Sequence, residues 1–97
     1  MLLNGEGRQV TAGTTAVLLT FGKAGANSVS VDVEGVNDVY ILVNTTKAAF
    51  DAAYTAGTTI KVRAGLQFAF VSDGLQNISS IVYYAPDGDS ALNIAAY

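Results

Sequence analysis

Apolar and polar residues alternate along several short stretches of this chain, and this period of two constrains the fold more than any other feature. The alternation is cleanest over residues 28–34, where valines fall on one side of an extended backbone and serine and acidic residues fall on the other. This stretch predicts a β-strand with one face in the core and one face in water. Residues 38–44 repeat the pattern, but Tyr40 and Leu42 make the second face apolar too. That strand is therefore expected to be central or buried at an interface.

Turn residues separate these stretches from others of the same kind at intervals of roughly 8 to 12 residues, a spacing typical of sandwiches and barrels. Because a turn at residues 35–37 joins the two strands above, we expect them to form an antiparallel hairpin. The pattern as a whole predicts an all-β, antiparallel β-sandwich of about eight strands, jelly-roll or Ig-like, forming a single domain over residues 1–97. The other predicted strands cover residues 8–11, 16–21, 59–63, 67–72, 78–84 and 91–95.

Residues 45–56 break the period of two. This segment is rich in alanine, and Phe50 and Tyr54 at positions i and i+4 would share one face of a helix, with Thr45 or Thr46 as the N-cap. The segment predicts a short helical excursion that covers an open end of the sandwich. The alternative is an excursion that contacts a neighbouring molecule.

Charged residues make up 13% of the chain and hydrophobic residues 51%, whereas an ordinary soluble domain is about 25% charged. Part of the surface is therefore neutral or apolar, which favours a surface that another molecule covers. A net charge of −3 and five scattered basic residues argue against binding to nucleic acid or to an anionic membrane. The first residues are too short an apolar run for a signal peptide, and no apolar run reaches the roughly 20 residues of a membrane span.

The chain contains no histidine and no cysteine, so the usual catalytic triads and zinc sites cannot be built. Asp32 and Glu34 share a strand face with serines, which favours a solvated face over a catalytic pair. The Asp87-Gly88-Asp89 sequence is first a turn signal, because a calcium loop needs a longer series of oxygen ligands. We therefore predict that the protein is not an enzyme and that it holds no cofactor or metal.

Residues on the apolar faces of strands that do not face the core are the candidates for an interface. A second hypothesis is a carbohydrate-binding module in which exposed tyrosines stack on sugars, although tyrosine fills interfaces equally well. We expect self-association or docking, with the covered residues being Tyr40, Leu42, Val71, Tyr84 and Tyr97.

Residues 39–97 carry a resemblance in the runs VYILVN, TIKVRAGLQFAF, ISSIVYY and ALNIAAY. They resemble the small β-sandwich structural proteins of tailed bacteriophages, in particular capsid decoration or cement proteins. The resemblance implies a non-enzymatic virion subunit that binds the major capsid protein or other virion subunits on the capsid exterior, often as a trimer, and stabilises the shell. Such a protein is made in the host cytoplasm without a signal peptide. A tail or head–tail connector subunit is a further alternative, and no site residue is transferred by the resemblance.

Overall fold

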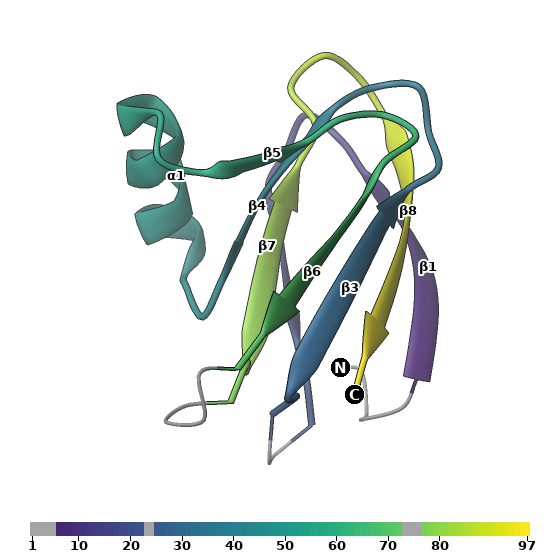
Figure 1. Ribbon diagram of the computed structural model, residues 1–97. Helices are drawn as coiled ribbons and strands as arrows, with labels where there is room; N and C mark the ends of the chain where they lie inside the picture. The colour runs from purple at the N-terminus through teal and green to yellow at the C-terminus, as the bar shows by residue number, and fades with distance from the viewer. Residues whose placement is uncertain (1–5, 23–24, 73–76) are drawn as a thin grey trace.

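A computed structural model describes residues 6–22, 25–72 and 77–97, and these form two four-stranded antiparallel sheets packed face to face (Figure 1). The first sheet has the order β1 (Glu6–Ala12), β8 (Ser90–Ala96), β3 (Ser28–Val33) and β6 (Gln67–Val71). The second sheet has the order β2 (Val17–Thr20), β7 (Ser80–Tyr84), β4 (Val39–Val43) and β5 (Ile60–Val62). A single described helix, α1 (Lys47–Ala56), connects β4 to β5. Each predicted strand segment overlaps one of these strands, so the prediction of an antiparallel two-sheet protein is confirmed.

The core lies between the two sheets and consists of the apolar sides of the alternating strands. Val29, Val31 and Val33 of β3 are fully buried, while the residues between them are partly exposed. Ile41 of β4 and Ile81 of β7 close the core from the second sheet. Burying a side chain of this kind stabilises the folded state by about 1.5–3 kcal/mol relative to leaving it exposed. The period of two in the sequence therefore records which residues face the other sheet.

The predicted hairpin between the first two clear strands is wrong. β3 pairs with β8 and β6, whereas β4 pairs with β7 and β5 in the opposite sheet. The valine faces of β3 and β4 meet across the core instead of lying side by side, because each needs an apolar layer opposite it and not only beside it. The chain between the two strands crosses from one sheet to the other.

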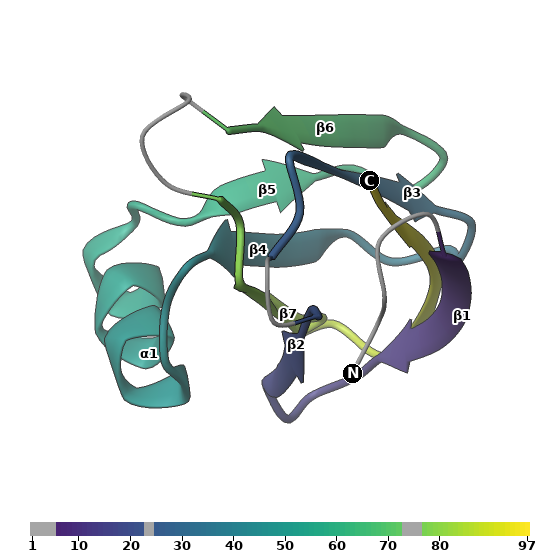
Figure 2. The same cartoon turned by 90° about the horizontal axis from the view of Figure 1, so that it is seen from below.

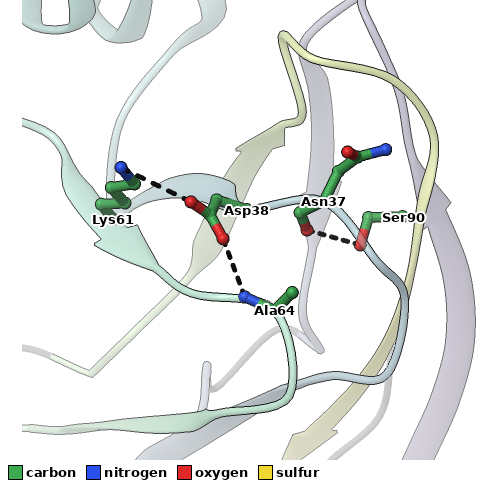
Figure 3. Close-up of polar contacts among 5 residues, drawn as sticks. All are labelled: Asn37, Asp38, Lys61, Ala64 and Ser90. Carbon is green, nitrogen blue, oxygen red and sulfur yellow. Dashed lines mark hydrogen bonds and ion pairs between the residues drawn. The ribbon is translucent and has the colours of Figure 1, made fainter.

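Hydrogen bonds to β8 fix this crossing. The backbone N–H groups of Glu34 and Gly35 both donate to the carbonyl of Ala91, at 2.9 and 3.1 Å. Ser90 donates through its Oγ to the carbonyl of Asn37, at 2.7 Å (Figure 3). The side-chain amide of Asn37 donates in turn to the carbonyl of Asp89. Residues 34–37 are therefore held against the start of β8. A hairpin turn between β3 and β4 would not make these contacts.

The predicted helix forms, and its caps are those that the sequence provides. The Thr46 side chain accepts a hydrogen bond from the Ala49 N–H at 3.1 Å, and Gly57 ends the helix with a positive φ of 76°. The position expected for it is wrong, however. Phe50 and Val82 are fully buried but lie outside the central core, so α1 covers the outer face of the β2-β7-β4-β5 sheet and not an open end of the sandwich (Figure 1).

The four strands at the sheet edges are β1 and β6 in the first sheet and β2 and β5 in the second. Seen from below, β5 and β6 lie along the same side of the sandwich (Figure 2). β6 is the most exposed of the strands, since Phe70 alone among its residues is even partly buried.

Candidate interaction surfaces

The five residues predicted to lie at an interface separate into two groups on opposite sides of the molecule. Tyr40, Leu42 and Tyr84 lie on the outer face of the second sheet, where Tyr40 is directly opposite Tyr84. Val71 and Tyr97 lie on the outer side of the first sheet. The structure therefore does not bring the five together into one patch.

Tyr40 and Tyr84 of the first group contact α1. The Tyr54 ring lies 5.0 Å from the Tyr40 ring and 5.1 Å from the Tyr84 ring, nearly perpendicular to both. Phe50 lies 6.2 Å from Tyr84, again edge to face. We call Tyr40, Phe50, Tyr54 and Tyr84 the aromatic cluster. Its members on the sheet are thus partly covered from within the chain, and the helical spacing of Phe50 and Tyr54 was the sequence signal for that cover.

A charged pair borders the aromatic cluster at the corner between β4 and β5. Lys61 lies with its Nζ 5.8 Å from the centre of the Tyr40 ring and 3.5 Å from Oδ2 of Asp38. The Ala64 N–H donates to Oδ1 of Asp38 at 2.9 Å (Figure 3). This backbone hydrogen bond is the main cause that lowers the pKa of the Asp38 carboxyl, against a smaller opposing effect of desolvation, and Lys61 and Arg63 lower it further.

The packing around the aromatic cluster also acts on its phenol groups. Desolvation raises the pKa of Tyr54, and the neighbouring Tyr40 and Tyr84 raise it further. Tyr54 is consequently neutral at physiological pH, and it contributes a ring and a hydroxyl group to the cluster, not a charge.

The second group is exposed. Val71 is 77% exposed and Tyr97 is 59% exposed. Both adjoin Ser28 of β3, because Val71 is its partner in β6 and the Tyr97 carbonyl accepts its N–H on the β8 side at 3.2 Å. Two of the predicted interface residues therefore flank one small serine in a row across the first sheet.

This row belongs to a face that is almost free of charge. Alternation from the buried residues of β8 and β3 assigns the outward positions of all four strands. Asp32 is the sole charged side chain among the strand residues of this face that the structure describes, and the exposed Glu34 follows β3 beside Ala91. We call the face the neutral face, and its members are Gly7, Gln9, Thr11, Ser28, Ser30, Asp32, Gln67, Ala69, Val71, Ala91, Asn93, Ala95 and Tyr97.

Sequence reasoning missed the free edge of the first sheet beside this face. Leu66 is 55% exposed and Phe68 is 38% exposed, and residues 66–71 contain no charged side chain. Phe68 and Phe70 lie on the same side of β6, with ring centres 5.0 Å apart, and Phe70 packs against the core. The signal for an edge was present in the sequence only as an uncharged strand, which a central strand also shows.

No group of three or more acidic, histidine or cysteine residues is close enough to hold a metal ion within residues 6–22, 25–72 and 77–97. Over the same described ranges, α1 is too short to cross a membrane.

Comparisons with solved structures match nearly the whole chain at low sequence identity. A de novo designed double-stranded β-helix aligns with 95% of this chain and 99% of its own, at 12% identity and a TM-score of 0.61. A cupin-2 domain protein from Shewanella frigidimarina aligns with 94% of this chain and 69% of its own, at 11% identity and a TM-score of 0.51. Hydroxypropylphosphonic acid epoxidase from S. wedmorenis aligns with 94% of this chain and 42% of its own, at 9% identity and a TM-score of 0.55.

No protein-family model and no curated protein matches the sequence. The structural likeness therefore shows a shared fold, an antiparallel architecture of two β-sheets. A designed protein and an enzyme are both similar to this chain, so the fold alone does not select a function.

Proposed function

We propose that this protein is a non-enzymatic structural subunit that binds a protein surface through the neutral face, and that this surface is the exterior of a bacteriophage capsid. The single observation that supports docking is the neutral face itself, a broad sheet surface whose strand residues include one charged side chain, the carboxylate of Asp32. Covering such a face removes few charges from water, so little desolvation opposes binding. Val71 and Tyr97 are exposed at one end of the face and would supply apolar contact.

We also infer a jelly roll within the sandwich class. In an immunoglobulin sandwich the first two strands share a sheet. Here the first strand pairs with the last, and β1 and β2 belong to different sheets. This strand order supports two interlocked Greek keys, the arrangement found in many viral capsid domains.

The carbohydrate-binding alternative has less support from the geometry. The Tyr54 ring stands at 83° to that of Tyr40 and at 89° to that of Tyr84. Perpendicular rings do not offer the coplanar platform on which a sugar chain would stack. A tail or head–tail connector subunit would use the same neutral face to bind a different partner. The capsid and connector hypotheses are therefore distinguished by which partner binds.

Co-sedimentation with purified capsids that lack the subunit tests the proposal. Val71→Asp and Tyr97→Asp should each weaken retention at least about tenfold, because a buried unpaired carboxylate costs more than 1.4 kcal/mol. Ala48→Asp is the matched control, since Ala48 lies exposed on α1, away from the neutral face. Retention of the wild type should change little between low and high salt, because apolar contact is not screened.

Three results would count against this function. They are loss of capsid binding at moderate salt, displacement of the protein by free oligosaccharide, and equal effects of the neutral-face variants and the α1 control. Binding to isolated tails but not to capsids would instead favour the connector alternative.

A further inference from the structure

We propose that β6 is the site at which two copies of this chain pair, with the two β6 strands antiparallel about a two-fold axis that passes beside Ala69. The contact would join the first sheets of two subunits into one continuous eight-stranded sheet. This proposal does not depend on the capsid function, because it rests on the geometry of β6 alone.

The backbone groups of β6 point alternately toward β3 and away from it. The Ser72 N–H donates to Asn27 at 2.7 Å and the Leu66 carbonyl accepts from Val33 at 3.0 Å, so even-numbered residues direct their backbone groups toward β3. Backbone groups alternate in direction along a strand. The N–H and C=O groups of Gln67, Ala69 and Val71 therefore point away from β3, at an edge where no described strand lies.

The outward-directed backbone groups also define the register of the pair. With the axis beside Ala69, this residue faces Ala69 of the partner subunit, and Gln67 faces Val71 of the partner subunit. Each of these pairs exchanges two hydrogen bonds, so all three outward-directed residues of both strands are satisfied. An axis shifted by one residue in either direction leaves one of the three without a partner in each copy. The centre beside Ala69 is thus the pairing that this edge fits best.

The side chains of β6 are compatible with this pairing. In the same register Phe68 lies opposite the partner subunit's Phe70, and this pair occurs twice. These are non-hydrogen-bonded pairs, in which opposing side chains come closest. Phe68 is 38% exposed in the single chain and would become covered. On the other side of the strand the residue at the axis is alanine, which lets the two backbones approach without obstruction.

The absence of charged side chains on β6 also favours a symmetric pair. A symmetric pair places residues near the axis close to their own copies, so a charge there would repel itself. Residues 66–71 are uncharged, whereas the edge strand β1 carries Arg8 and the edge strand β5 carries Lys61. Charges of this kind protect a free edge from pairing. The edge strand β2 is uncharged as well, but it has only four residues. The backbone N–H and C=O groups of just two of them, Leu18 and Thr20, point away from β7.

Single-cysteine variants test the register directly, because the chain has no cysteine of its own. In the proposed pair, Cα atoms of the two Ala69 residues are about 5.5 Å apart, within the range of about 4.4–6.8 Å that a disulfide spans. Two copies of Val71 are about 14 Å apart, four residues along the strands. Under mild oxidation Ala69→Cys should form a covalent dimer rapidly, whereas Val71→Cys, at a position that is 77% exposed, should not.

Equal cross-linking of both variants would indicate random collision, and cross-linking of neither would indicate that β6 does not meet its copy. Either result overturns the proposal, as does faster cross-linking of Val71→Cys. Equilibrium sedimentation of the unmodified protein provides a second measurement. It should show a monomer–dimer equilibrium that Ala69→Asp weakens at least tenfold and that Gln9→Asp, on the opposite edge of the same sheet, leaves unchanged. A strict monomer at high concentration, or a trimer as the sole oligomer, would contradict two-fold pairing through β6.

Discussion

At the scale of single residues, the crossing between the two sheets depends on a position where no side chain fits. A Cβ atom on Gly35 would meet the backbone N of Ala91 at 2.5 Å and Cα of Ser90 at 2.7 Å, and it would also clash with Oγ of Ser90. The neighbouring atoms belong mostly to the backbone of β8, so they cannot move aside without disturbing the sheet. Gly35 is therefore the residue that allows β3 to leave its own sheet so close to β8.

Gly35→Ala should lower the free energy of unfolding by about 1–3 kcal/mol, the usual cost of forcing an extra carbon into a packed site. Gly7→Ala in β1 is the matched control, because a Cβ there meets only Oδ1 of Asn93, at 3.9 Å. Chemical denaturation of the two variants measures the difference. Equal stability of Gly35→Ala and the wild type would show that the crossing is not as tight as described.

Asp38 supplies a pH-dependent contribution at the β4–β5 corner. Its pKa is lower in the folded chain than in the unfolded chain, so the carboxylate stabilises the fold above its unfolded pKa of about 3.9. This stabilisation is lost as the pH falls through the lower folded value. We expect Asp38→Asn to melt at a lower temperature than the wild type near pH 6, and the gap to shrink below about pH 4.

Thermal unfolding followed over that pH range measures the effect. Asparagine keeps an oxygen that can accept the Ala64 N–H, so the comparison isolates the charge. Asp51→Asn, on the exposed side of α1, is the control and should melt in parallel with the wild type. A gap for Asp38→Asn that stays constant from neutral to acidic pH would contradict the assigned role.

At the scale of secondary-structure elements, α1 is held to the sandwich by one fully buried ring and the tyrosines around it. Ten residues are too few for a helix to be stable alone in water, so α1 depends on this packing. Phe50 is the point of attachment, since it is completely buried and lies against both Tyr84 and Tyr54.

Phe50→Ala should lower the free energy of unfolding by about 3 kcal/mol through the lost contacts and the resulting cavity. It should also decrease the helical signal in far-ultraviolet circular dichroism, because α1 loses its main contact with the sheet. Lys47→Ala, at an exposed position of the same helix, should change neither quantity by much. Loss of stability without any loss of helical signal would show that α1 is fixed by other contacts.

At the scale of the whole molecule, the sequence pattern was sufficient for the elements but not for their pairing. The alternation in residues 28–34 identifies one apolar face, and β3 has that face. It does not say whether the next strand lies beside β3 or across the core from it, because both arrangements bury the same valines. The predicted hairpin was wrong for this reason. The alternation does not report the close approach of Gly35 to β8, where a Cβ atom would not fit.

The candidate surfaces were predictable to a similar extent. Alternation assigned Tyr40 and Tyr84 correctly to the side away from the core, but it could not show that α1 folds back over them. It also could not show that β6 lies at an edge, because strand order follows from long-range contacts. The neutral face emerges only when four strands from distant parts of the sequence are placed side by side.

The most direct test of the docking account is a comparison of electron-microscopy density for capsids with and without the bound protein. The account predicts added density on the capsid exterior in which the β1-β8-β3-β6 sheet faces the shell and α1 points away from it. Added density with α1 and the aromatic cluster against the shell, or no added density at saturating protein, would contradict it.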